Sequence, residues 1–211
     1  MSPDWLERFR QCGAVTDGHF LLSSGLHSPI YVQSALILQY PEEAQSLGAA
    51  LAERVRPLRP QVVIGPALGA VVVAHEVARA LGVRAIFAER VEGRMALRRG
   101  FAIAEGERVL VVEDVITTGG SAAEVASLVR SAGGEVVGFG ALVDRTGGRM
   151  DLEARLEALI TLDLPTFAPD RCPQCREGVP ARKPGSRLNP LPTPSFLGER
   201  AGRVSDGLAG Q

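Results

Sequence analysis

The residues of this chain that are most able to carry out chemistry lie in one short run, residues 109–121. Its first four residues, 109–112, are apolar and predict a buried strand, and Glu113 and Asp114 then place two carboxylates at the carboxyl end of that strand. A turn of hydroxyl groups and glycines, residues 117–121, opens a predicted helix. Backbone N–H groups at a helix N-terminus bind phosphate, and paired carboxylates accept hydrogen bonds from sugar hydroxyls or attract a cation. The run therefore predicts a site for a sugar phosphate.

Two other interpretations of this run are less consistent with the sequence. A nucleoside triphosphate loop has the pattern G-x-x-x-x-G-K-[ST], but the only lysine of the chain, Lys183, is far from any such turn. The run could also be an ordinary parallel strand with an acidic, glycine-rich turn. The coincidence of the carboxylate pair with two threonines, two glycines and a serine favours phosphate binding.

The bulk composition excludes several classes of function. The net charge is −1 and the pI is near 6.3, so the chain has no general attraction for nucleic acid or for an anionic membrane. No stretch is apolar enough to span a bilayer, and the first residues lack the apolar run of a signal peptide. The three cysteines argue against a secreted disulfide framework, so we expect a cytoplasmic protein.

The pattern along the chain predicts an α/β fold. The expected strands are residues 19–22, 30–32, 62–64, 84–87, 109–112 and 136–143, and the expected helices are about 3–12, 41–56, 70–81 and 121–132. Strands alternating with helices indicate a parallel sheet covered on both faces, which binds ligands at the carboxyl ends of its strands. The turns after Ile64, Phe87, Val112 and Val143 are therefore expected to meet at one edge.

The acidic run resembles the phosphoribosyl pyrophosphate (PRPP) signature of the type I phosphoribosyltransferases, and Glu113 to Gly119 is most similar to the orotate-specific members. The resemblance covers about residues 10–165. It implies a mostly parallel central sheet flanked by helices, with a small N-terminal hood. We expect one domain over residues 1–185, with hood elements at about 1–35 and 150–185. The composition after 186 predicts a weakly ordered tail over residues 186–211.

The activity that the resemblance implies is transfer of ribose 5-phosphate from PRPP to orotate, which gives orotidine 5′-monophosphate and pyrophosphate in pyrimidine synthesis. The implied cofactor is Mg²⁺, carried mainly by PRPP rather than by protein side chains. The implied partners are these two small molecules and a second copy of the chain, because family members form homodimers that share an active-site loop. Neither nucleic acid nor a membrane is expected as a partner.

The resemblance also assigns residues to the PRPP site. The expected catalytic residues are Glu113, Asp114 and Arg94. The positions expected to bind PRPP are Ala67, Leu68, Arg90, Arg94, Glu113, Asp114, Val115, Ile116, Thr117, Thr118, Gly119, Gly120 and Ser121. Residues 90–99 hold four arginines around a central glycine and predict a mobile cationic loop, with a solvated hairpin as the alternative. The chain departs from many relatives at Ser23 and Leu68, where they carry lysine.

Recognition of the base is assigned to both ends of the domain. Arg145, which follows a predicted strand, could pair its planar guanidinium with the carboxylate of orotate, and the resemblance adds Thr117. A structural ion pair between Asp144 and Arg145 is the alternative. The resemblance further implies that the base rests against Ile30 and Tyr31 of an N-terminal hairpin.

Three other functions remain open from the sequence. The first is a phosphoribosyltransferase of the same fold that acts on a purine and needs no partner for a carboxylate. The second is a non-catalytic regulator that senses PRPP, although the additional basic or helix-turn-helix segment of a DNA-binding version is not found. The third is an interaction protein that acts through its tail, which would leave the acidic run unexplained.

The cysteines and histidines give weaker signals. Cys172 and Cys175 have zinc-knuckle spacing, but no second Cys or His pair lies near them in the sequence. We therefore expect a structural turn there, with a partial metal site as the alternative. His75 is expected in the core, because it lies in an almost wholly apolar helix, and His19 and His27 have no evident carboxylate partner.

Overall fold

The computed structural model describes residues 4–22, 24–148 and 153–184. They fall into two compact units: a sheet unit, made of the described residues of 38–163, and a hairpin unit, made of residues 4–37 and 164–184 apart from residue 23. The predictions for Ser23 and for the tail 186–211 lie outside the described residues.

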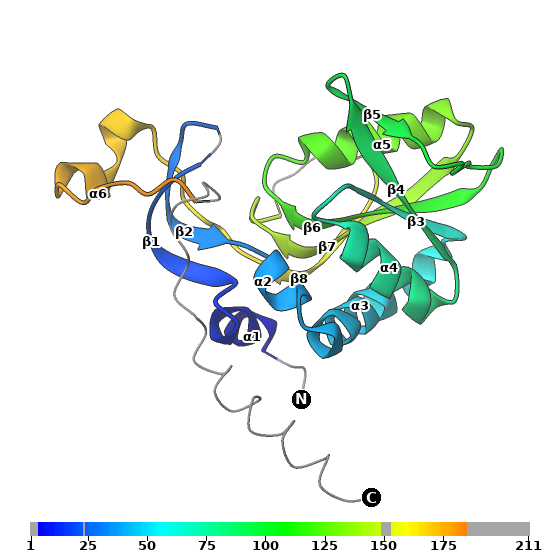
Figure 1. The fold of residues 1–211 in the computed structure, drawn as a ribbon, viewed down its shortest axis with the longest axis horizontal. Coiled ribbons are helices and arrows are strands. Elements are labelled where there is room, and N and C mark those ends of the chain that lie inside the picture. Colours follow the sequence, from blue (N-terminus) through cyan, green and yellow to red (C-terminus); the bar gives the residue numbers. More distant parts are fainter. Residues whose placement is uncertain (1–3, 23, 149–152, 185–211) are drawn as a thin grey trace, which may run out of the picture. The chain divides into compact units, whose positions relative to one another are not determined.

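A six-stranded sheet forms the centre of the sheet unit, with the order β5-β4-β3-β6-β7-β8 (Figure 1). All neighbouring strands are parallel except β4 and β5, so the predicted, mostly parallel sheet is confirmed. The elements of this unit, in chain order, are α3 (Pro41–Val55), η1 (Arg56–Leu58), β3 (Val62–Pro66), α4 (Val71–Leu81), β4 (Arg84–Val91), β5 (Arg94–Leu97), β6 (Arg108–Ile116), α5 (Gly120–Ser131), β7 (Glu135–Asp144) and β8 (Leu156–Thr161).

Helices cover both faces of this sheet. On one face, the α5 residues Val125 and Val129 pack with Ile64 of β3 in a single buried core. On the other face, a Cβ added at Gly140 of β7 would lie 3.4 Å from Leu51 of α3. Because successive strand residues point to opposite faces, the central strands need apolar residues at nearly every position. This requirement explains why they appear in the sequence as unbroken apolar runs.

Sequence patterns located the helices more closely than they located the strand ends. Helix α3 begins at Pro41, whose missing N–H costs nothing at a first helical position. Strand β6, expected to end at residue 112, continues to Ile116 because β7 pairs with it up to that residue. Strand β8 was not predicted, since its mixed apolar and charged residues become a strand only through pairing with β7.

The expectation that His75 lies in the core is wrong. Its side chain is 69% exposed, and Val72, one turn earlier on α4, is also exposed. Helix α4 buries Val73 and Val77 against the sheet unit instead. An almost continuous apolar run conceals which face of a helix is buried, because the helical periodicity loses its contrast.

The hairpin unit is built on the antiparallel strands β1 (Val15–Leu21) and β2 (His27–Val32), so the predicted hairpin is confirmed. Its other elements are α1 (Trp5–Gln11), η2 (Pro169–Arg171) and α6 (Pro173–Arg176), while α2 (Ala35–Leu38) ends where the sheet unit begins. Residues 164–184, the last described segment, lie beside the hairpin in Figure 1 and are joined to it by bridges from His27 to Phe167 and from Phe20 to Arg182. Residues almost a whole chain apart therefore become neighbours.

Among the described residues, no helix is long and apolar enough to cross a membrane.

Close packing of α3 on α4 generates a first prediction. A Cβ added at Gly48 of α3 would overlap the Cβ of Glu76 and would lie 2.8 Å from its carbonyl carbon. Replacing a glycine inside a helix by alanine normally stabilises that helix by about 1 kcal/mol. We expect Gly48→Ala to lower the free energy of unfolding by about 1–3 kcal/mol, because the two helices must separate.

Urea unfolding followed by circular dichroism measures this difference. Gln45→Ala, at an exposed position of the same helix, is the matched control and should leave the free energy of unfolding nearly unchanged. A more stable Gly48→Ala protein would show that α3 and α4 accommodate a Cβ at residue 48 without separating.

Candidate active site

The two acidic side chains lie on strand β6 itself rather than after it. Strand β6 is central in the sheet, between β3 and β7. Glu113 is buried and Asp114 is half-buried, and as consecutive strand residues they point to opposite faces of the sheet. The predicted pair is therefore present at the carboxyl end of β6, but its two members have different surroundings.

Burial changes the chemistry of Glu113. Loss of solvent, together with the neighbouring charge of Asp114, raises the pKa of Glu113 from its ordinary value of 4.5 to about 8. A hydrogen bond from the Asp114 backbone opposes this rise only in part. Near pH 7 the Glu113 carboxyl of the free protein therefore keeps its proton and can donate a hydrogen bond.

The turn after β3 lies directly against Asp114. A Cβ added at Gly69 would lie 2.8 Å from Oδ1 and 3.0 Å from Oδ2 of Asp114, so a side chain at this position would displace the carboxylate from where it now lies. The peptide bond between Ala67 and Leu68 in this turn is cis. Within the described chain, the N–H groups of Leu68 and Gly69 donate to no protein acceptor.

The turn after β6 has the backbone that the sequence predicts for a phosphate loop. Gly119 has a φ of 72°, a left-handed conformation that starts helix α5 at Gly120. The side chain of Gly119 is only a hydrogen, so nothing caps the first N–H groups of this helix. Thr117 and Thr118 are exposed, and they place hydroxyl groups beside those donors. The turn can therefore surround an anion with N–H and O–H donors.

Val115 and Ile116, which were also expected to bind PRPP, belong to β6 rather than to the turn. The side chain of Ile116 is buried in the core. Any contact from Ile116 to a ligand would therefore have to come from its backbone. Ser121 lies in the first turn of α5 and is half-buried.

Strand β7 places Arg145 beside the phosphate loop. Asp144 pairs in register with Ile116, and the N–H of Arg145 donates to the carbonyl oxygen of Ile116 at 2.9 Å. Arg145 therefore lies next to Thr117, which follows Ile116 directly. The carboxylate of Asp144 accepts hydrogen bonds from Thr146 and Gly148, at 2.7–3.0 Å, and so shapes the turn that carries Arg145.

The arginine-rich residues 90–99 form a hairpin. Strands β4 and β5 pair around a turn at Glu92 and Gly93, which have φ values of 49° and 84°. The backbone therefore has the form of the hairpin alternative, but that alternative expected arginines without contacts, whereas Arg99 pairs with Glu89 at 2.8 Å. Arg90 forms a two-pronged ion pair with Glu124 of α5, at 2.9 and 3.2 Å, and Arg94 is exposed.

Ile30 and Tyr31 lie on β2 of the hairpin unit and are half-buried. The ring of Tyr31 packs against Phe20, with ring centroids 5.6 Å apart. Their expected contact with the base stays a prediction.

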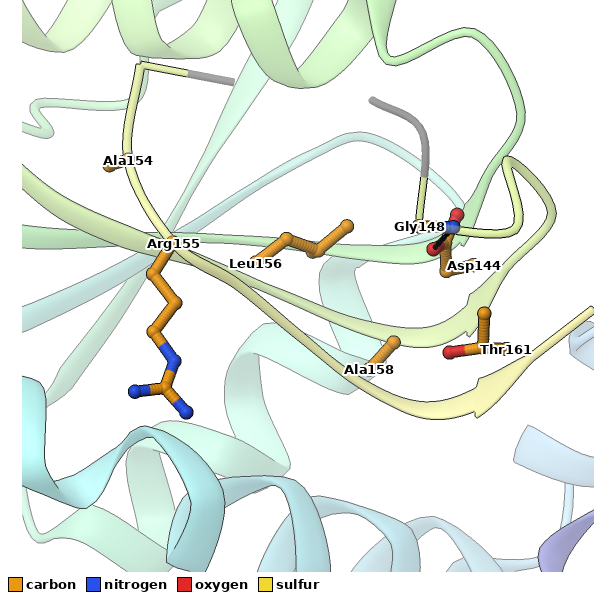
Figure 2. Close-up of a pocket in the computed structure, with 7 residues that line it drawn as sticks. All are labelled: Asp144, Gly148, Ala154, Arg155, Leu156, Ala158 and Thr161. Carbon is orange, nitrogen blue, oxygen red and sulfur yellow. Dashed lines mark hydrogen bonds between the residues drawn. The ribbon is translucent and has the colours of Figure 1, made fainter. Parts of the chain in front are cut away.

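A cavity of 380 Å³ runs along β8, which contributes Leu156, Ala158 and Thr161 to its lining (Figure 2). Asp144, at the end of β7, also lines it. The lining also includes Gly148 and Ala154, which border residues outside the description. Its lining includes none of the predicted site residues, although Asp144 holds the turn that carries Arg145.

One cluster of functional side chains was missed by the sequence analysis. Cys172 and Cys175 have no such pair near them in the sequence, but the fold brings His19 and His27 of the hairpin to them. The two pairs are about 150 residues apart in the chain, and spacing rules cannot register such a contact. The C-x-x-C pattern was the only available signal.

The raised pKa of Glu113 predicts a pH-dependent stability. A carboxyl whose pKa is higher in the folded than in the unfolded chain stabilises the fold below pH 4.5, and this contribution is lost as the pH rises towards 8. Glu113→Gln removes the ionisable carboxyl and with it the loss of folding stability at high pH. We therefore expect the unfolding temperature of this variant to exceed that of the native chain by roughly 3–8 °C at pH 8.5 and by much less at pH 5.

Thermal unfolding of the ligand-free protein at both pH values measures the effect. Glu92→Gln in the exposed β4–β5 turn is the control and should show no such pH dependence. An equal change of the unfolding temperature at both pH values would refute the assignment of a neutral Glu113.

Comparison with known proteins agrees with this geometry. Residues 34–163 match the family model described as the phosphoribosyl transferase domain. The chain is 56% identical over 179 residues to the orotate phosphoribosyltransferase of Pelotomaculum thermopropionicum, a match that covers 85% of this chain and 94% of that protein. It is 53% identical over 182 residues to the same enzyme of Caldanaerobacter subterraneus subsp. tengcongensis, with 86% and 96% covered.

A solved structure gives the same result. The orotate phosphoribosyltransferase of Mycobacterium tuberculosis, in complex with inorganic phosphate, superimposes with a TM-score of 0.62 and 31% identity. The match covers 75% of this chain and 94% of that chain. By sequence and by fold, the chain belongs to the phosphoribosyltransferase family and, within it, to the orotate phosphoribosyltransferases.

Proposed function

We propose that this chain transfers the ribose 5-phosphate group of PRPP to a ring nitrogen of orotate and releases pyrophosphate. One observation carries the proposal: strand β6 brings a carboxylate against one glycine turn and continues directly into a second one. Asp114 lies against Gly69. The phosphate loop follows Ile116 directly and leads into α5 at Gly120. Two donor-rich turns that flank an acidic strand end suit a pentose with a phosphate at one carbon and a diphosphate at another.

Each group of the donor finds a chemical counterpart. The N–H groups of residues 118–121 and the hydroxyl of Thr117 would hold the 5′-phosphate. The N–H groups of Leu68 and Gly69 would hold the pyrophosphate, because they belong to the turn that lies against Asp114 and donate to no acceptor within the described chain. Asp114 accepts from a ribose hydroxyl, while neutral Glu113 can donate to another.

Mg²⁺ fits the same site. This ion is usually bound by one or two carboxylates together with substrate phosphates, and Asp114 lies where the pyrophosphate is proposed to bind. When bound with PRPP, Mg²⁺ neutralises charge on the departing pyrophosphate. The remaining work is done by the residues of the chain, which orient the donor and the base and exclude water.

The proposed reaction requires positioning rather than a protein nucleophile. As the bond from C1′ to pyrophosphate breaks, positive charge develops on the ribose ring and negative charge on the leaving group. Fixed donors around the pyrophosphate stabilise the negative charge. The base attacks effectively only when it is held close to C1′, so its recognition is part of the rate acceleration.

Arg145 is the proposed partner of the orotate carboxylate. Its guanidinium offers two parallel N–H donors to a carboxylate, a geometry that a neutral base such as uracil does not match. The backbone bond to Ile116 holds Arg145 beside Thr117, which is the other residue assigned to the base. Recognition of the base and binding of the 5′-phosphate are thereby joined at one strand end.

The active assembly is proposed to be a homodimer in which the β4–β5 hairpin supplies Arg94 to the site of the partner. Arg94 is exposed, whereas Arg90 on the paired strand already contacts Glu124. An exposed arginine at the end of a hairpin can approach a pyrophosphate bound to another copy of the chain.

Release of pyrophosphate in the presence of PRPP and Mg²⁺ tests the base. We expect turnover with orotate and none with uracil, adenine or hypoxanthine. Arg145→Ala should raise the KM for orotate by roughly 100-fold and change the KM for PRPP by less than about threefold, since only one substrate loses its charged partner.

Arg145→Lys should give an intermediate KM for orotate, because it keeps the charge but not the planar fork. Arg155→Ala, which removes an exposed arginine elsewhere in the same unit, is the control. Equal increases of both KM values in Arg145→Ala would remove the assignment, and turnover of adenine by the native protein would replace the proposed function.

Mixing of two inactive variants tests the shared hairpin. Asp114→Asn should weaken the use of PRPP, and Arg94→Ala should lower kcat. In a dimer that shares its hairpins, co-expression of both variants restores one intact site in each mixed dimer, or about a quarter of the native activity. No recovery, although mixed dimers are isolated, would show that Arg94 serves its own subunit.

A further inference from the structure

Four side chains that can ligate a metal ion converge inside the hairpin unit. His19 and His27 come from the strands β1 and β2, and Cys172 and Cys175 come from the segment that carries α6. Their ligand atoms all lie within 4.8 Å of one another. His19, His27 and Cys172 are buried, and Cys175 is exposed. Both thiols are free rather than joined in a disulfide.

The distances between these atoms match the edges of a small tetrahedron. Nε2 of His19 lies 3.3 Å from Sγ of Cys172 and 3.7 Å from Sγ of Cys175, and Nδ1 of His27 lies 3.3 Å from Sγ of Cys175. Ordinary Zn–S and Zn–N bond lengths in a tetrahedral site give sulfur–nitrogen edges of about 3.6 Å. The two nitrogens are 2.7 Å apart. They need to separate by only about 0.6 Å to reach the corresponding nitrogen–nitrogen edge.

The surroundings of His19 prepare it as a ligand. Nδ1 of His19 lies 2.7 Å from the carbonyl oxygen of Val179. A carbonyl oxygen can only accept, so Nδ1 carries the hydrogen, and Nε2 of the neutral ring presents its lone pair to the two sulfurs. Such a carbonyl partner behind a histidine fixes the orientation and tautomer of the ring in metal sites.

The segment 164–184 has little else to hold it in place. Of its residues, Cys172 alone is fully buried, and neither η2 nor α6 buries a side chain. Its backbone meets the hairpin at the ligand residues themselves: His27 exchanges two hydrogen bonds with Phe167, and the N–H of Arg182 donates to the carbonyl of His19. A segment without an apolar core of its own needs a covalent or metal link to be stable.

We propose that His19, His27, Cys172 and Cys175 form a structural Zn²⁺ site that fastens the segment 164–182 to the β1–β2 hairpin. Two thiolates and two imidazoles in a tetrahedron are the donor set that Zn²⁺ prefers. All four positions are filled by protein side chains, which is the arrangement of structural rather than catalytic zinc sites. The ligands lie in the hairpin unit, whereas Glu113, Asp114 and the phosphate loop lie in the sheet unit.

A network of hydrogen bonds among the same groups is the competing explanation. Thiols are weak donors and weak acceptors. The hydrogen bonds of such a network would therefore offset little of the free-energy cost of burying two imidazoles and a thiol. A zinc ion instead bonds strongly to all four atoms. The choice between the two explanations is decided by the metal content of the protein.

Metal analysis of the full chain, purified without a polyhistidine tag and dialysed against metal-free buffer, tests the site. We expect about one zinc per chain, and replacement by Co²⁺ should give the visible absorption of tetrahedral cobalt with a thiolate charge-transfer band. Cys175→Ser and Cys172→Ser should each lower the retained metal at least about tenfold and abolish the cobalt–thiolate band.

Cys12→Ser is the matched control, because it removes the third free thiol and should leave one zinc per chain. Cys175 is exposed, so circular dichroism of Cys175→Ser can show that lost zinc does not merely reflect an unfolded chain. Chelation should lower the unfolding temperature of the native chain but not that of Cys175→Ser. A folded native chain without zinc that takes up no Co²⁺, or a Cys175→Ser variant that keeps its zinc, would overturn the proposal.

Discussion

Placing two carboxyl groups at the same strand end as an anion-binding turn is the constraint on which the rest of this structure depends. Like charges at such a short distance repel one another and would also repel a phosphate. Burial resolves the conflict at Glu113, whose raised pKa keeps the carboxyl neutral near pH 7. In the proposed function, this strand end would offer two acidic side chains to the ribose without carrying the full charge of both. Helix α5, which starts at Gly120, would supply the favourable end of its dipole to a phosphate in the proposed loop.

The sheet converts this local arrangement into a complete site. Strand β6 is buried between β3 and β7, so the turns that follow these three strands emerge at one edge. The register decides which residues meet: Gly69 contacts Asp114, and Arg145 bonds to the backbone just before Thr117. Glycine at residue 69 permits that approach, because a Cβ there would displace the Asp114 carboxylate from its position.

The hairpin unit follows a different principle. Its helix α1 and hairpin bury apolar residues such as Phe9 and Phe20, but the C-terminal segment is attached to them by polar contacts. The proposed zinc ion would hold this segment in its folded position through four coordination bonds, whereas the sheet unit is held together by its hydrophobic core. The hairpin that carries two of the ligands also carries Ile30 and Tyr31.

The sequence by itself determined the features that depend on neighbours in the chain. The strand–turn–helix of residues 109–131, the start of α3 at Pro41 and the family of the protein were all predictable, because periodicity, turn residues and the phosphate motif are local. Only the tertiary structure decided which distant groups meet. It brought the two histidines to the two cysteines, exposed His75, paired Arg90 with Glu124 and made a strand of residues 156–161. These outcomes depend on register and packing between segments, and the spacing of residues along one segment does not record them.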